Sequence, residues 1–271
     1  MSFSPREAVD YVAAHGLGDL MDYEEPLVGG NASGDGVVRV GRTVRKPWAA
    51  STPSVVAFVN ALRAAGVDAP APLGRDDAGR QVQEFVPGSL ALDQYPLTQP
   101  ELRRVGAMIR QIHDASTIYE PQAGAVWETA IPAPGDDLIC HNDLAPWNLL
   151  MGERWMFIDL DAAAPSTRLW DLAYAAQAFT LSDPERDPGL AAADLAAFAD
   201  GYEADDELRR HLPDTMSERT TAMYELLRSS HENGSEPWAS MFAEGHGEHW
   251  LRADRYVRSH RDTWRVALHA S

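Results

Sequence analysis

The stretch HNDLAPWNLL at residues 141–150, followed by FIDLD at residues 157–161, decides how the rest of the chain is interpreted. Within it, Asp143 lies five residues before Asn148, and a short apolar run then ends at a second carboxylate, Asp159. A strand that ends at Asp159 would deliver its carboxylate to the place where the other two side chains lie. The sequence therefore predicts one cluster of oxygen ligands, which suits a hard divalent cation.

This set of side chains has the chemistry that phosphoryl transfer from a magnesium nucleotide needs. One carboxylate, Asp143, can orient an acceptor hydroxyl and take its proton, while Asn148 and Asp159 can hold the metal. A metal-dependent hydrolase that uses His141, Asp143 and Asp159 is the alternative interpretation of the same cluster.

The spacing of His141, Asp143 and Asn148 resembles the catalytic loop of kinase-like small-molecule phosphotransferases, the aminoglycoside phosphotransferase (APH) family. The motif WDLA at residues 170–173 is a second point of similarity. The residue after His141 is Asn142, where protein kinases typically have arginine. The resemblance therefore points to small-molecule enzymes rather than to protein kinases.

The resemblance implies a protein-kinase-like α+β fold with two lobes. A small antiparallel β lobe at residues 1–86 would bind the nucleotide, and a larger, mainly helical lobe at residues 87–271 would carry catalysis and substrate binding. The implied activity moves the γ-phosphate of a Mg²⁺-nucleotide, ATP or alternatively GTP, to a hydroxyl of a small molecule. In this assignment Asp143 is catalytic and Asn148 and Asp159 hold Mg²⁺. His141 braces the loop, and Asp171 hydrogen-bonds its backbone.

The pattern along the chain fits such a fold. Short β-branched runs separated by glycines predict consecutive antiparallel strands up to residue 46, and a further hairpin ends near residue 86. Thr52 as N-cap residue, followed by Pro53 at the first helical position, predicts a helix that ends at Gly66. A capping-box pattern at Thr98 opens a second helix. Further helices are expected at about residues 166–180, 189–204, 214–230 and 247–268, the last with Trp250, Val257 and Trp264 on one face.

Three parts of the first lobe are candidate nucleotide contacts. A glycine-rich segment can lay backbone N–H groups against phosphates, and its candidates are Gly30, Asn31, Ser33 and Gly34. By the resemblance, the backbone at Glu84 and Val86 would bind the adenine edge.

A basic residue on the third strand is the remaining nucleotide contact. Arg45 and Lys46 are adjacent and therefore point to opposite faces. The resemblance favours Lys46 toward the phosphates, with Arg45 exposed or sharing the role. The helix at 53–65 contains no Asp or Glu that could pair with this lysine. A nucleotide-binding pseudoenzyme or regulator of the same fold is therefore the alternative function.

An acidic stretch suggests the class of acceptor. Residues 183–207 contain nine acidic residues and one basic residue. Carboxylates in the helical lobe of the family receive ammonium groups, so the stretch favours an aminoglycoside or another cationic acceptor. A solvated acidic surface is the alternative explanation.

Composition excludes several classes of partner. The net charge of −18 disfavours nucleic acid and anionic membranes. No apolar run is long enough to span a membrane, and residues 1–7 have no signal-peptide core. The single cysteine, Cys140, fits a reducing cytoplasm and is expected to pack as a small apolar residue.

Overall fold

The computed structural model describes residues 23–27 and 36–269. An antiparallel sheet at one end of the chain has the strand order β1-β2-β3-β5-β4. Its strands are β1 (Glu24–Pro26), β2 (Val38–Val40), β3 (Thr43–Lys46), β4 (Pro72–Arg75) and β5 (Gln81–Glu84). The glycine-rich candidates Gly30, Asn31, Ser33 and Gly34 lie outside the described residues.

Helix α2 (Thr52–Ala64) contacts β4 of this sheet, and its buried Val55, Phe58 and Leu62 belong to the main hydrophobic core. The helix begins one residue earlier than the sequence predicted, with Ser51 as its N-cap residue. Pro53 still lies in the first turn, where its missing N–H costs no helical hydrogen bond.

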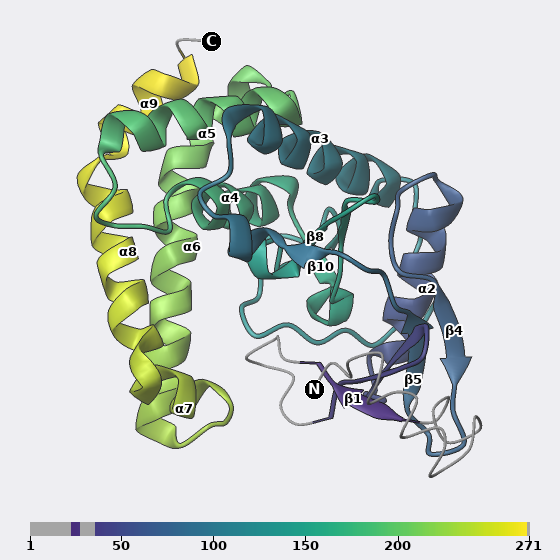
Figure 1. Ribbon diagram of the computed structural model, residues 1–271. Helices are drawn as coiled ribbons and strands as arrows, with labels where there is room; N and C mark the ends of the chain where they lie inside the picture. The colour runs from purple at the N-terminus through teal and green to yellow at the C-terminus, as the bar shows by residue number, and fades with distance from the viewer. Residues whose placement is uncertain (1–22, 28–35, 270–271) are drawn as a thin grey trace, which may run out of the picture.

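The rest of the chain is mainly helical, so the predicted α+β fold class is confirmed (Figure 1). Its helices are α3 (Gln99–Ser116), α4 (Arg168–Thr180), α5 (Pro188–Tyr202), α6 (Asp206–Asn233), α7 (Trp238–Met241), α8 (Gly247–Ser259) and α9 (Arg261–His269). The predicted capping box opens α3, because the Glu101 carboxylate accepts the Thr98 backbone N–H at 2.8 Å. In the described residues, no helix is long and apolar enough to cross a membrane.

The prediction of one helix at 247–268 is wrong. The chain breaks at His260, and two helices result, α8 and α9. The indole Nε1 of Trp264 donates to the Val257 carbonyl at 2.9 Å and so satisfies an acceptor that the helix end leaves free. Trp250, Val257 and Trp264 are all buried, as their spacing predicted.

Short strands flank the 141–148 loop within the mainly helical part of the chain. Strand β7 (Leu138–Cys140) pairs with β10 (Ala164–Ser166), and β8 (Leu149–Met151) pairs with both β9 (Met156–Phe157) and β6 (Ser89–Leu90). The strand that the sequence predicted before Asp159 corresponds to β9. The 3-10 turns η1 (Ala91–Gln94), η2 (Pro146–Asn148) and η3 (Leu160–Ala162) and the π turn η4 (Phe242–His246) complete the elements of residues 23–27 and 36–269.

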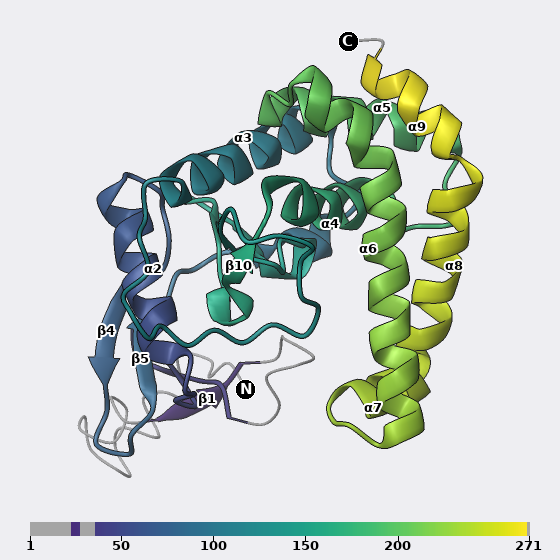
Figure 2. The same ribbon diagram turned by 180° about the vertical axis from the view of Figure 1, so that it is seen from behind.

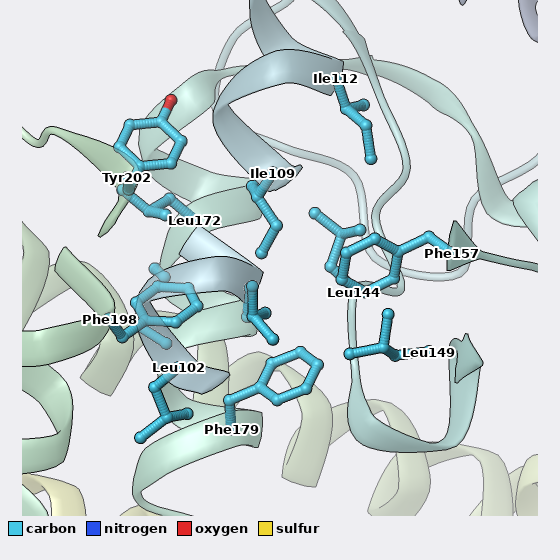
Figure 3. Packing of buried hydrophobic residues seen from close by; sticks show 14 of the residues in the cluster. Leu102, Ile109, Ile112, Leu144, Leu149, Phe157, Leu172, Phe179, Phe198 and Tyr202 are labelled. Atoms are coloured by element: carbon cyan, nitrogen blue, oxygen red, sulfur yellow. The ribbon is translucent and has the colours of Figure 1, made fainter. Parts of the chain in front are cut away.

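The hydrophobic core anchors the 141–148 loop through buried leucine side chains (Figure 3). Leu144 within the loop and Leu149 just after it are fully buried. They belong to one cluster with Phe157 of β9, Phe179 of α4 and Ile109 of α3. Because both leucines are anchored, the polar residues between them are presented on a rigid base.

Helices α3 and α5 cross through two glycines, and this contact gives a stability prediction. A methyl group at Gly201 would overlap the backbone carbonyl of Arg103, and one at Gly106 would overlap the carbonyl of Phe198. Gly201→Ala is therefore expected to push the helices apart and to lower the free energy of unfolding by about 1–3 kcal/mol in urea titrations. Arg103→Ala is the control, because it keeps the backbone in place and removes only a half-exposed side chain. Equal stability of Gly201→Ala and the wild type would contradict the crossing.

Candidate active site

A cleft of about 960 Å³ brings together the polar residues that the sequence singled out. Four of the predicted site residues line it: Lys46, Asp143, Asn148 and Asp159. The cleft also has walls from α4, α6, α7 and α8, and Figure 2 shows α6 and α8 side by side with α7 at their end. The site thus combines the edge of the sheet, the 141–148 loop and one face of the helical part.

Asp143 is held by two donors, one on each carboxylate oxygen. The Tyr174 hydroxyl donates to Oδ1 at 2.9 Å, and Nδ2 of Asn148 donates to Oδ2 at 2.7 Å. The same Asn148 amide also donates to the Asp143 carbonyl at 3.0 Å. The carboxylate is therefore fixed in orientation while its residue remains partly exposed in the cleft.

The ends of β8 and β9 place Asn148 and Asp159 at the same edge. The Ile158 N–H donates to the Asn148 carbonyl at 2.9 Å, so the residue before Asp159 lies beside Asn148. His141 Nε2 bonds the Ile158 carbonyl at 3.1 Å and ties the start of the loop to this edge. Asp159 itself has a left-handed backbone, with φ 59°. The amide nitrogen of Asn148 is used by Asp143, which leaves the amide oxygen as its free ligand atom.

A buried network under the loop shapes its first turn. Asn142 has a left-handed backbone with φ 62°, and its N–H donates to Asp171 Oδ1 at 2.9 Å. The other Asp171 oxygen lies 3.0 Å from His113 Nε2, and His113 Nδ1 lies 2.8 Å from the Tyr202 hydroxyl. All these side chains are buried, so the network is closed to water.

Cys140 lies beside this network and is fully buried, as predicted for a small apolar residue. Burial and the nearby Asp171 carboxylate raise the pKa of its thiol far above the usual range. Cys140, His113 and Asp171 lie close together, but both ring nitrogens of His113 and both carboxylate oxygens of Asp171 already have hydrogen-bond partners. We therefore interpret these three residues as structural.

Lys46 has an acidic partner that the sequence did not predict. Its Nζ lies 2.6 Å from Asp161 Oδ1 and 3.5 Å from Asp159 Oδ1. Burial alone would lower the pKa of Lys46, but the two carboxylates outweigh it, and the pKa is raised. The lysine is therefore charged and oriented by the segment that carries Asp159, although helix α2 supplies no acid.

Three nucleotide candidates within the described residues, Arg45, Glu84 and Val86, do not belong to the cleft lining. Arg45 alternates with Lys46 along β3 and points to the opposite face of the sheet. The Glu84 side chain is held by Arg154, with Nη1 to Oε1 at 2.6 Å, and by the Ala71 N–H at 3.1 Å. Its carboxylate is therefore occupied, and Val86 is buried where the chain leaves the sheet. Only the backbone of these two positions can serve a ligand.

The acidic stretch at 183–207 does not form the acceptor site that the sequence suggested. None of its nine carboxylates lines the cleft. Asp187 and Asp205 cap the N-termini of α5 and α6 instead. Others pair with arginines, among them Asp194 with Arg186 and Asp200 with Arg209.

The acceptor side of the cleft includes residues to which the sequence assigned no site role, namely Tyr174, Glu128, Glu244 and Arg219. The Tyr174 ring stacks on Trp250 at 6.3 Å between centroids, and Trp147 meets Tyr174 edge-on at 6.5 Å. Glu128 and Glu244 bring acidic side chains to the lining, and Arg219 brings a buried cation. These residues come from separate elements with no shared motif, so only the folded chain shows that they meet.

Comparison with known proteins gives one family and one curated relative. Residues 119–210 match the model described as the phosphotransferase enzyme family, APH. The trifolitoxin immunity protein of Rhizobium leguminosarum bv. trifolii is 26% identical over 247 residues, which cover 82% of this chain and 89% of that protein.

Solved structures of small-molecule kinases share the fold. A choline/ethanolamine kinase family protein from Mesorhizobium loti has a TM-score of 0.59 and 16% identity, and the match covers 98% of this chain and 99% of that chain. The amicoumacin kinase hAmiN in complex with AMP-PNP, Ca²⁺ and Ami has a TM-score of 0.58 and 12% identity over 95% and 94% of the chains. The gentamicin–APH(2")-IIa complex has a TM-score of 0.53 and 8% identity over 97% and 99%.

Proposed function

We propose that this chain is a member of the phosphotransferase enzyme family, whose model matches residues 119–210, and that it transfers the γ-phosphate of a magnesium nucleotide to a hydroxyl of a small molecule. The observation that carries the proposal is the Asp143 carboxylate. Two hydrogen bonds orient it inside the cleft that Lys46 and Asp159 also line.

In this proposal Asp143 acts as the base. The acceptor hydroxyl would donate to the carboxylate, and its proton would pass to Asp143 as the phosphoryl group is transferred. Tyr174 and Asn148 keep the carboxylate in one orientation, so little ordering remains to be done when the acceptor binds.

The donor set fits Mg²⁺. The free amide oxygen of Asn148 and the carboxylate of Asp159 would hold the ion, with Asp161 next to them, and all three are the oxygen ligands that this cation prefers. When bound, the ion neutralises charge on the nucleotide phosphates. Lys46 would exchange its contact with Asp161 for the phosphates.

The Lys46–Asp161 pair argues against the alternative of a pseudoenzyme. That alternative was motivated by the absence of an acidic partner on the helix that follows Lys46. Asp161 supplies a partner at 2.6 Å from another part of the chain, so the motivation disappears. The adenine contacts at the backbone of Glu84 and Val86 remain part of the proposal.

The acceptor in this proposal is a hydroxy compound with a cationic group. The similar structures include a choline/ethanolamine kinase family protein and a gentamicin complex, and choline, ethanolamine and gentamicin all carry such groups. In this chain Glu128 and Glu244 supply negative charge to the cleft, whereas the stretch at 183–207 does not.

A metal-ligand variant tests the proposal. The purified protein is screened with ATP and GTP against amino alcohols, aminoglycosides and sugars for Mg²⁺-dependent phosphate transfer. Asp159→Asn is expected to lower turnover by at least about 100-fold and to raise the Mg²⁺ concentration required, because a neutral amide binds the cation less strongly. The control Asp262→Asn changes a carboxylate that is almost fully exposed on α9 and should behave as wild type. Equal turnover of Asp159→Asn and wild type would contradict the assignment of the metal site.

A further inference from the structure

Arg219 is a buried cation for which the described part of the chain shows no ion pair and no hydrogen bond. It lies in the middle of α6, its residue is 6% exposed, and it belongs to the cleft lining. Its Nη1 is buried without a hydrogen-bond partner among the described residues. Two other arginines of α6 are paired, Arg209 with Asp200 and Arg228 with Glu225.

A buried charge without an ion pair lowers the stability of the fold, so its presence suggests a role in binding a ligand. Burial lowers the pKa of Arg219, but arginine keeps its proton in proteins, so the guanidinium is charged. An unpaired buried charge destabilises a folded chain. The rings of Tyr174 and Trp170, at 4.3 Å and 5.7 Å from Cζ, offset part of this cost by cation–π contact. They satisfy none of the N–H donors in the plane of the guanidinium.

The position of Arg219 relates it to the acceptor rather than to the nucleotide. Its guanidinium packs on the Tyr174 ring, and the Tyr174 hydroxyl donates to Asp143 Oδ1 at 2.9 Å. One phenol ring therefore separates the cation from the carboxylate that would receive the reacting hydroxyl. Its neighbours along the cleft on the same helix, Met223 and Leu226, are apolar.

We propose that Arg219 binds a carboxylate of the acceptor and thereby selects hydroxy acids over neutral analogues. The proposal rests on the proposed phosphotransfer, whose acceptor it specifies. A planar guanidinium offers paired N–H donors that match the two oxygens of a carboxylate. With Glu128 and Glu244 elsewhere in the cleft lining, the site suits a zwitterionic acceptor whose amine and carboxylate lie at different walls. Specificity would follow because an acceptor without the acid leaves the buried cation unpaired.

Matched acid–amide pairs test this proposal. The probes are L-serine with L-serinamide, glycerate with glyceramide, and gluconate with gluconamide. Phosphate transfer is measured as kcat/KM, and binding is measured by calorimetry with Mg²⁺ and AMP-PNP present. For at least one pair, wild type is expected to prefer the acid by about 30-fold or more. Arg219→Gln should reduce this ratio to near one while leaving the nucleotide KM unchanged, and Arg219→Lys should retain part of it. Arg228→Gln, an exposed position on the same helix, is the control and should keep the wild-type ratio.

The melting temperature separates binding from a purely structural role. Removing an unpaired buried charge should leave the thermal midpoint of Arg219→Gln equal to or above that of wild type. The proposal is overturned if no acid binds or reacts better than its amide, or if Arg219→Gln keeps the acid preference. A rise in nucleotide KM would assign the residue to the phosphates instead, which also overturns it. If amides or amines are phosphorylated and the acids are not, the proposed phosphotransferase function stands and only the role of Arg219 is overturned. If the acids bind better than their amides but no probe is phosphorylated, carboxylate binding by Arg219 is supported and the proposed phosphotransferase function is overturned.

Discussion

Replacing Asp143 by asparagine is expected to lower kcat by about 10²- to 10⁴-fold and to leave folding intact. The amide keeps the shape of the side chain and can still accept from the Tyr174 hydroxyl, which in the wild type lies 2.9 Å from Oδ1. It cannot take a proton from the acceptor hydroxyl. Its nitrogen would also face Nδ2 of Asn148, so the second hydrogen bond to the carboxylate is lost. Steady-state turnover and single-turnover phosphate transfer measure the effect.

Nucleotide binding and folding are the controls for this variant. Affinity for Mg²⁺–nucleotide should change little, because the proposed phosphate and metal contacts come from Lys46, Asn148 and Asp159. Asp77→Asn, an exposed carboxylate in the hairpin between β4 and β5, should match wild type in every measurement. A kcat of Asp143→Asn equal to that of wild type would remove the residue from the chemistry and with it the proposed reaction.

The central loop of this site was predictable because its information is local. Asp143 and Asn148 belong to one loop of six residues, and Asp159 follows within one hairpin. The pairing of β8 with β9 returns the chain to the same edge, so spacing in sequence translates directly into proximity. The adjacency of Arg45 and Lys46 on a strand likewise predicts that they lie on opposite faces, and the burial pattern of β3 agrees with that alternation.

The partners of these residues were not predictable, because they come from distant segments. Asp161 pairs with Lys46 across 115 positions, and no motif connects the two. Tyr174 and Arg219 reach the cleft from α4 and α6, where the sequence shows only an ordinary helical pattern. The acidic stretch at 183–207 misled for the opposite reason. Its carboxylates are used instead by helix capping and by pairs with arginines, one of which, Arg186–Asp194, is largely buried.

Asp171, a distant partner that supports the 141–148 loop, gives the largest expected effect on stability when it is replaced by alanine. The carboxylate accepts the Asn142 N–H at 2.9 Å and contacts His113 Nε2 at 3.0 Å, and it is 1% exposed. Alanine would leave two polar groups buried without partners, at a cost of about 1–3 kcal/mol each. Chemical denaturation should therefore show a loss of about 3 kcal/mol in the free energy of unfolding. Turnover of the remaining folded protein should also fall, since the left-handed turn at Asn142 that presents Asp143 loses its support.

The neighbouring acid Asp114 is the matched control for this loss. Asp114 lies next to His113 but is half exposed at the surface, where it pairs with Arg110 and Arg168. Asp114→Ala should cost no more than about 1 kcal/mol, because exposed ion pairs contribute little. Asp171→Asn should fall between the two, since its oxygen can still accept the Asn142 N–H while its amide alters the contact with His113. If Asp171→Ala proved as stable and as active as Asp114→Ala, the buried network would not hold the loop, and the support for Asp143 would have to come from the core leucines Leu144 and Leu149 alone.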